Sequence, residues 1–397
     1  MSKRFRLTKA SKILIVFLIV ALIGGGVFAG LKTGFIKTKT AASSDAKENV
    51  VAANKGTSSD SGTPSSKKTT KKTDGDATIN LSLDEWTGWK SIIDGNQGLT
   101  TQPGSIYDKL GIKVNINIIN DATQSSNALI KGDLNAAGYT INRTAFLSQK
   151  FTDAGKEVVM PFITNYSNGG DGIIAKSSIQ SVNDLVGAKI GVPEFSEAQT
   201  LVVWFVNNSD LSDEQKSEII DNLVLFSTAD DTAKAFFAGQ VDVAATWEPY
   251  LTQAQNMTDA HVLFSTASST NLVMDGILFD KEFAEAHPDV VEKFIQGALE
   301  ASSMYDTEFD AVREVMPMFN TASDEDIIAS TKTAKLTTWK DNSDLLNGTA
   351  KTIYSDMCNV WTSIGESVNA SLVDAIFDDT YIDAIADNFN TTEVSNT

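Results

Sequence analysis

The chain has 397 residues, of which 42% are hydrophobic and 21% are charged, a composition typical of a globular protein of two or three domains. One cysteine and two separated histidines (Cys358, His261 and His287) exclude a disulfide framework and argue against a metal site with Cys or His ligands. The net charge is −19. Since 14 basic and 5 acidic residues precede Ala77, the remainder has 18 basic and 46 acidic residues, a poor surface for nucleic acid.

Residues 1–37 have the pattern of an export signal. Basic residues among the first twelve precede an uncharged run from Ile13 to Leu31, which is 19 residues long and near the lower limit for spanning a bilayer. Val27-Phe28-Ala29 fits a signal-peptidase site. A cleaved signal peptide and an uncleaved membrane anchor therefore both stand, and we favour the anchor because of the segment that follows.

Residues 38–76 are rich in Ser, Thr, Lys, Gly and Ala, as in SSDSGTPSSKKTTKKTDGD. Such a composition lacks the large apolar side chains that a core needs, so it predicts a flexible linker. A linker between a membrane segment and a globule acts as a tether. If the signal were cleaved, the linker would have no membrane segment to connect, so its presence favours the uncleaved anchor.

From residue 77 onward, strand and helix patterns alternate, which predicts an α/β fold with largely parallel sheets. The predicted strands include Thr78–Leu83, Lys113–Ile119, Ala188–Val192 and Leu223–Phe226, and the predicted helices include Glu197–Asn207 and Thr232–Ala238.

One pattern occurs twice, at an offset of 107 residues. The segments Ile119–Thr140 and Phe226–Glu248 both consist of a strand end, a polar loop, a short helix, a glycine, a second short strand and a polar loop, with Gly132 aligned on Gly239. We interpret the two segments as corresponding parts of two lobes, although helix–Gly–strand units also match by chance.

Polar and aromatic residues follow the predicted strands, and ligands bind at the carboxyl ends of strands in open α/β sheets. Ser196 and Gln199 form a predicted capping box, so the helix start at Glu197 is a candidate site for an oxyanion or simply a well-capped helix. Trp247 and Glu248 precede Pro249, which suits a helix start. These two residues either face a ligand or cap the core and the helix.

The soluble part resembles the extracytoplasmic solute-binding proteins of ABC transporters in the nitrate/sulfonate/taurine family. The similar stretches are NGGDGIIAKSSIQSVNDLVGAKIGV (168–192), read as a hinge-crossing strand, a helix and a strand, FFAGQVDVAATWEPYLTQA (236–254), and LFDKEFAEAHPDVVEKFIQGALEA (278–301), read as a later helix. Residues 302–397 have apolar positions at helical spacing and are expected to pack on the first lobe.

The resemblance implies a two-lobed α/β fold of the type II periplasmic-binding-protein kind. Lobe one is expected at 77–172 and 273–397, and lobe two at 173–272. Gly169, Gly170 and Gly172 are expected near the first hinge crossing.

The resemblance also implies a set of ligand contacts, and no catalytic residue, metal or cofactor. Arg143 is the one basic residue near these loops, so a small zwitterion suits them better than a bare inorganic anion. The implied ligand-binding residues are Trp86, Trp89, Asn165, Tyr166, Ser196, Gln199, Trp247, Glu248 and Asp275.

The implied function is capture of a small anion or zwitterion by lobe closure, followed by delivery to an ABC permease on the outer face of a bacterial membrane. We expect a monomer that does not bind nucleic acid. Two alternatives remain: a membrane-tethered ligand sensor, and an enzyme on the same scaffold. The enzyme is less favoured because the sequence has no GxSxG, HExxH or phosphate-loop motif, and Asp171 or Glu248 as a base would stand alone.

Overall fold

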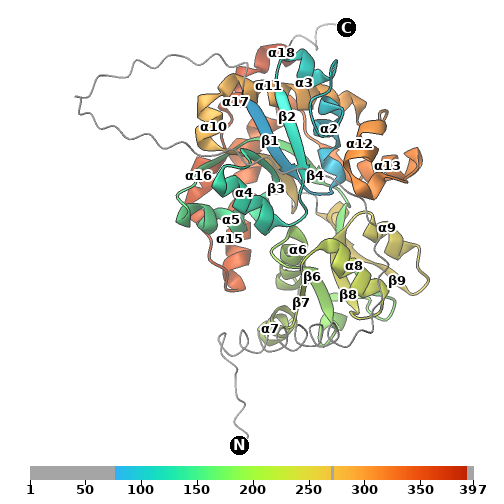
Figure 1. The fold of residues 1–397 in the computed structure, drawn as a ribbon. Coiled ribbons are helices and arrows are strands. Elements are labelled where there is room, and N and C mark those ends of the chain that lie inside the picture. The colour runs from blue at the N-terminus through green and yellow to red at the C-terminus, as the bar shows by residue number, and fades with distance from the viewer. Residues whose placement is uncertain (1–76, 270–271, 391–397) are drawn as a thin grey trace, which may run out of the picture. The chain divides into compact units, whose positions relative to one another are not determined.

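The structure, a computed structural model, describes residues 77–269 and 272–390, which form two β-sheets with helices packed against them (Figure 1). The predicted signal or anchor (1–37) and the predicted linker (38–76) lie outside the described residues. Among the described helices, none is both long and apolar enough to cross a membrane.

The first sheet has six strands in the order β11-β4-β10-β3-β1-β2. β1 pairs in parallel with β2 and β3, whereas β10 runs antiparallel to both β3 and β4. The strands are β1 (Thr78–Leu83), β2 (Lys113–Ile118), β3 (Ala136–Thr140), β4 (Val158–Ser167), β10 (Met274–Asp280) and β11 (Ala334–Leu336).

The helices associated with this sheet come from both ends of the chain. Together with the sheet they enclose one hydrophobic core, to which residues 79–163 and 274–385 contribute, and we call this unit the first lobe. The helices are α2 (Lys90–Asn96), α3 (Ile106–Lys109), α4 (Ala122–Lys131), α5 (Ile141–Asp153), α10 (Lys281–Ala286), α11 (Pro288–Ala301), α12 (Asp310–Val315), α13 (Asp324–Thr331), α14 (Trp339–Asp344), α15 (Ala350–Ser363), α16 (Val373–Ile376), α17 (Thr380–Ala384) and α18 (Ala386–Asn390).

The second sheet has five strands in the order β7-β6-β8-β5-β9 and forms the second lobe. Ile173 and Ile174 are neighbours in β5, and because side chains alternate along a strand they enter separate hydrophobic clusters. The elements are β5 (Asp171–Lys176), β6 (Ile190–Pro193), β7 (Val224–Phe226), β8 (Val243–Trp247), β9 (Ala260–Ser265), α6 (Glu197–Asn207), α7 (Asp213–Asp221), α8 (Ala229–Phe237) and α9 (Tyr250–Gln255).

The two copies of the repeated pattern occupy equivalent places in the two sheets. In each lobe the strand next to one edge of the sheet, β1 or β6, pairs in parallel with its two neighbours. An antiparallel strand, β10 or β5, then pairs with the other side of β3 or β8. Gly132 and Gly239 both adopt left-handed backbone angles, with φ of 81° and 72°. This conformation favours glycine and ends α4 and α8 in the same way.

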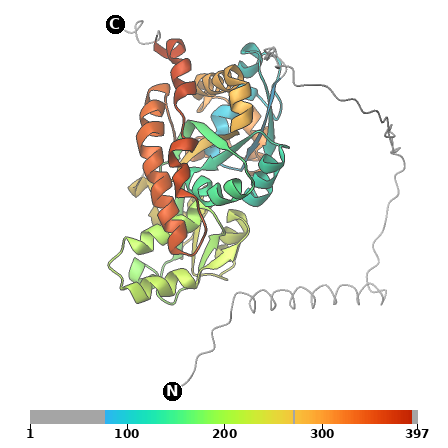
Figure 2. The same cartoon turned by 90° about the vertical axis from the view of Figure 1, so that its left-hand side faces the viewer.

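Two expectations for single segments were wrong in detail. Residues 278–301 are not one helix, because a proline has no N–H to continue a helix and α11 begins anew at Pro288 after α10. The predicted helix between β5 and β6 is only a single 3₁₀ turn, η3 (Val182–Leu185). The C-terminal part packs on the first lobe, as expected. It also contains the edge strand β11, and α15 contacts α6 of the second lobe as well as α5 of the first (Figure 2).

Candidate functional site

Loops at the carboxyl ends of the parallel strands of both sheets enclose two adjoining cavities. The outer chamber has a volume of about 400 Å³ and the inner chamber about 10 Å³, and both are lined by Asp84 and Trp247. The inner chamber is lined by Asp84, Trp86, Thr140, Asp171, Glu197, Trp247, Val273 and Asp275. Since Asp84 follows β1 of the first lobe and Trp247 ends β8 of the second, the chambers lie between the lobes.

Trp86 is held in place by the first lobe. Its indole Nε1–H donates to Asn165 Oδ1 and to Asp275 Oδ2, each at 3.1 Å. A Cβ on Gly88 would lie 2.4 Å from Trp86 Nε1, and one on Gly170 would lie 2.3 Å from the Trp86 ring. These two glycines are therefore required for the position of the ring. Gly170 lies where the chain first passes from one lobe to the other, so this part of the chain packs directly against the Trp86 ring.

Arg143 of α5 joins the two lobes through buried ion pairs. It lies 3.1 Å from Asp84 Oδ2 of its own lobe and 3.3 Å from Glu197 Oε2 at the first position of α6. Thr140 Oγ1 also donates to Glu197, at 3.2 Å, and Trp89 Nε1–H donates to Asp84 Oδ1 at 2.7 Å. Burial lowers the pKa of Arg143, but the carboxylates of Glu197 and Asp84 outweigh it and raise the pKa overall.

Asp171 and Asp275 line the inner chamber without a counter-ion. They are 3% and 2% exposed, and neither has an ion-pair partner within residues 77–269 and 272–390. Burial, reinforced by Glu197, raises the pKa of Asp171 to about 8. Burial, reinforced by Asp171, likewise raises the pKa of Asp275 well above its ordinary value. The inner chamber is therefore poor in positive charge.

The Trp247-Glu248-Pro249-Tyr250 stretch joins β8 to α9 at the outer chamber. Glu248 accepts hydrogen bonds from the N–H and the hydroxyl of Thr252, at 3.0 and 2.9 Å, so its carboxylate caps α9 while it lines the chamber. Tyr250 donates its hydroxyl to Asp230 Oδ1 at 3.0 Å. This stretch therefore has both of the expected roles: Glu248 caps α9, and Trp247 and Glu248 form part of the cavity wall.

The start of α6 is built as predicted, with one change. The Ser196 hydroxyl accepts the N–H of Gln199 and donates to the carbonyl of Pro193, at 3.2 and 2.7 Å. The Gln199 side chain accepts from the N–H of Phe195 at 2.7 Å rather than from Ser196. Ser196 lines the outer chamber, and the carboxylate nearest this helix start is the chain's own Glu197.

Further contacts between the lobes lie beside the chambers. Asn142 Nδ2–H donates to Thr200 Oγ1 of α6 at 2.9 Å. The rings of Phe146 and Phe195 stack with their centroids 4.4 Å apart. Each of these pairs joins α5 of the first lobe to the β6–α6 region of the second.

The structure thus brings five of the nine predicted ligand residues to the chambers. The other four do not line the chambers. Trp89 and Asn165 donate to or accept from Asp84 and Trp86, which do, the Gln199 side chain accepts from the loop before α6, and the Tyr166 ring packs against the Lys335 ammonium. The five lining residues are Trp86, Ser196, Trp247, Glu248 and Asp275.

Glu197 is missing from the predicted set, as are Asp84, Arg143 and Asp171. Asp84 could have been found because it directly follows β1, two residues before Trp86. Glu197 reads as an ordinary first-turn acid of a helix, and only the fold places it against Arg143.

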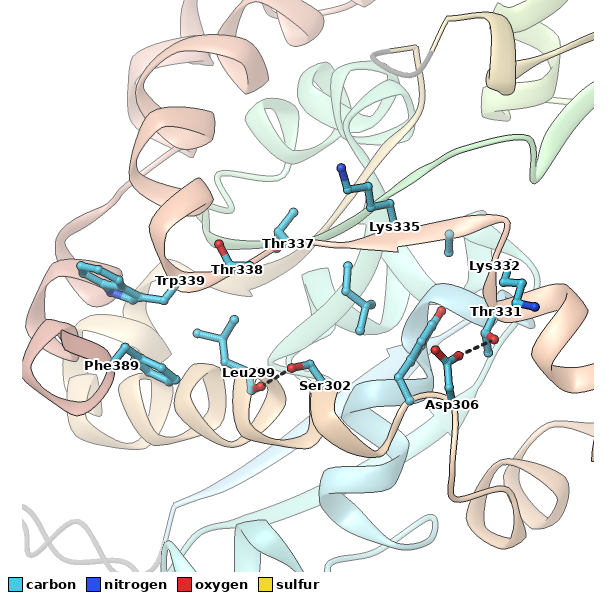
Figure 3. Close-up of a pocket in the computed structure, with 13 residues that line it drawn as sticks. Leu299, Ser302, Asp306, Thr331, Lys332, Lys335, Thr337, Thr338, Trp339 and Phe389 are labelled. Carbon is cyan, nitrogen blue, oxygen red and sulfur yellow. Dashed lines mark hydrogen bonds between the residues drawn. The ribbon is translucent and has the colours of Figure 1, made fainter. Parts of the chain in front are cut away.

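A third cavity, of about 480 Å³, lies in the first lobe alone, beside the edge strand β11 (Figure 3). Trp339 and Phe389 stack at one end, and Asp306 accepts a hydrogen bond from Thr331 at the other. Because all of its walls belong to one lobe, motion of the lobes would not close it around a ligand.

The NMT1/THI5-like family model matches residues 105–305. The solved periplasmic aliphatic sulphonate binding protein SsuA from Escherichia coli is 15% identical, with a TM-score of 0.58 over 77% of this chain and 98% of that one. The periplasmic nitrate-binding protein NrtA from Synechocystis is 11% identical, with a TM-score of 0.58 over 81% and 91%. No curated protein sequence matches the chain. At these identities the structural likeness is one of fold, the two-lobed periplasmic-binding-protein-like α/β fold.

Proposed function

The chain belongs to the NMT1/THI5-like family, and from this premise we propose that it is the extracytoplasmic solute-binding component of an ABC importer. In this role it captures a small charged solute between its two lobes and presents the closed form to a permease. The observation that carries the proposal is the pair of chambers between the lobes, lined by side chains from the strand ends of both sheets.

Lobe closure is the proposed mechanism, with no covalent step. The chain crosses between the sheets from β4 to β5 through Gly169 and Gly170, and returns between β9 and β10. The described parts of the two crossings lie side by side, since the Gly169 N–H donates to Thr266 Oγ1 at 2.9 Å, and paired crossings favour rotation of one lobe against the other. The lobe boundaries proposed here are 77–172 with 273–397, and 173–272.

The proposed ligand contacts are the five predicted residues that line the chambers. Trp86 and Trp247 supply aromatic surface, Asp275 lies in the inner chamber, and Glu248 and Ser196 lie in the outer one. Asn165 and Trp89 are proposed to affect binding indirectly, because they hold Trp86 and Asp84 in place. Gln199 and Tyr166 remain proposed ligand contacts.

We propose that the N-terminal part tethers this globule to the membrane. The support is the basic start, the apolar run from Ile13 to Leu31 and the polar linker 38–76. A tethered monomer on the extracytoplasmic face would stay close to its permease, which raises the effective concentration of the complex.

Intrinsic tryptophan fluorescence of the full chain, titrated with a panel of small anions, zwitterions and cations, tests the capture function. We expect a saturable change with at least one solute, because Trp86 and Trp247 line the chambers. Trp247→Ala should abolish the change, whereas Trp339→Ala, in the third cavity, should keep it. A folded protein that responds to no member of the panel would contradict the proposal.

A further inference from the structure

The walls of both chambers are acidic to an extent that an anion-binding site does not explain. Eight acidic residues line the two chambers, and Arg143 is the one basic residue among their described lining. Arg143 is already paired with Asp84 and Glu197. A nitrate or sulfonate here would share a partly desolvated space with several carboxylates, where like charges repel strongly.

The inner chamber has a second feature that points to a positive group. Asp171 and Asp275 are buried beside it, and in the described part of the chain no Lys, Arg or His pairs with either carboxyl group. Burying a carboxylate without a counter-charge is costly. Burial accordingly raises the pKa of both groups. Asp275 Oδ2 accepts a hydrogen bond from the Trp86 indole, but neither carboxyl group has an ion-pair partner among the described residues, so a cation that enters the chamber meets two carboxyl groups without a counter-charge.

Size and chemistry narrow the class of cation. The inner chamber, at about 10 Å³, has room for one water-sized group, which is the size of an –NH₃⁺ group. Trp86 and Trp247 line the same chamber, and indole faces attract ammonium groups. No described group of three or more His, Cys, Asp or Glu side chains is arranged to hold a metal ion, so the features fit an organic cation.

We propose that the inner chamber receives a primary ammonium group, so that the captured solute is a small organic amine. This inference rests on the proposed capture function and names its substrate class. The outer chamber then holds the rest of the molecule, and its own carboxylates, Glu248 and Glu194 among them, favour a second amine at the far end. A diamine should therefore bind more tightly than a monoamine of the same length.

Four probes of one chain length test the assignment on the full protein. They are 1,4-diaminobutane, n-butylamine, n-butanol and butane-1-sulfonate, each titrated by isothermal calorimetry and by tryptophan fluorescence. We expect 1,4-diaminobutane to bind most tightly, n-butylamine more than tenfold more weakly, and neither n-butanol nor butane-1-sulfonate to bind.

Two substitutions test the site itself. Asp275→Asn keeps an oxygen for the Trp86 indole N–H and should lower n-butylamine affinity at least tenfold. Glu248→Gln should lower the affinity for 1,4-diaminobutane but leave that for n-butylamine within twofold. The exposed Asp133→Asn is the matched control and should bind both amines as the parent does.

The outcomes separate this inference from the capture function. Saturable binding of butane-1-sulfonate, or of a panel anion, without binding of either amine would overturn the amine assignment and leave solute capture standing. Failure of all four probes overturns the amine assignment, and failure of the wider panel as well overturns both. If Asp275→Asn and the parent bind n-butylamine with equal affinity, the inner chamber is not the ammonium site.

Discussion

Asp171 stands at the start of β5, directly after the glycines of the first chain crossing, and its carboxyl group lines the inner chamber. The pKa of this group is about 8, because burial and the nearby Glu197 disfavour its charged form. In the unfolded chain the pKa of an aspartate is about 3.9. The folded protein therefore holds a proton on Asp171 over a pH range in which the unfolded chain has released it.

The sign of the resulting pH dependence follows from this difference. Between about pH 4 and pH 8 the folded form binds more protons at Asp171 than the unfolded form, so this group makes the free energy of unfolding fall as pH rises. Above about pH 8, the pKa of Asp171 in the folded protein, this contribution to the free energy of unfolding no longer changes with pH.

Asp171→Asn should remove this contribution. We expect the variant to be more stable than the parent at pH 8 by about 1 kcal/mol or more, with a smaller gain or none at pH 4. Thermal unfolding of parent and variant from pH 4 to pH 8, without added amine, measures the difference. Asp133→Asn, at an exposed position, serves as the control and should follow the parent. Parallel curves for Asp171→Asn and the parent would show that Asp171 ionises normally.

At the scale of elements, the two lobes are variations on one unit. α4 and α8 both end at a left-handed glycine, Gly132 or Gly239, where an added Cβ would meet nothing within 4 Å. The requirement for glycine is therefore one of backbone conformation alone. A residue with a side chain pays about 1 kcal/mol or more for left-handed angles.

Gly132→Ala and Gly239→Ala should each lower the free energy of unfolding by about 1 kcal/mol, and by similar amounts, because the two sites are equivalent. Gly348→Ala is the matched control, since Gly348 lies in a helical segment with open space around it and no positive φ. It should be neutral or slightly stabilising. Chemical denaturation measures all three, and a large loss for Gly132→Ala alone would contradict the equivalence.

The local sequence pattern predicted those helices and strands whose bounds are set by residues inside or next to the element. The bounds of β1 (Thr78–Leu83) and α6 (Glu197–Asn207) are those expected, because alternation defines the first and the Ser196 cap defines the second. The three-residue β11 was missed because so short a strand is specified by its pairing with β4, not by its own sequence.

The same limit applies to the candidate site: the sequence indicated which residues follow strands, but not which side chains of the two lobes meet. Trp86, Trp247 and Glu248 were expected beside a cavity because residues after parallel strands gather at one sheet edge, and all three line the chambers. The pairing of Glu197 with Arg143, and the lack of an ion-pair partner for Asp171 among the described residues, depend on which loops of the two lobes meet. A single sequence carries no local signal for such contacts.

At the scale of the described globule, solute capture depends on how favourable the closed arrangement of the lobes is. The stacked pair Phe146 and Phe195 joins the lobes without lining either chamber, and the Phe146 ring also lies 5.0 Å from that of Trp361. If the Phe146–Phe195 stack exists only when the lobes are closed, its energy contributes to solute affinity at a distance from the solute. Any loss of closing energy lowers the population of the binding-competent form and weakens affinity in proportion.

Phe146→Ala should therefore weaken solute binding about three- to tenfold, because an aromatic pair contributes about 0.5–1.5 kcal/mol. Tryptophan fluorescence titration with 1,4-diaminobutane, or with the panel solute that binds best, measures the change. X-ray scattering without solute should show a larger radius of gyration for the variant. The control is Phe389→Ala, which removes the stack on Trp339 at the third cavity and should leave affinity unchanged. Unchanged affinity in Phe146→Ala would mean that the stack is present in the open form too, and that closure is driven by the ion pairs of Arg143 and the solute itself.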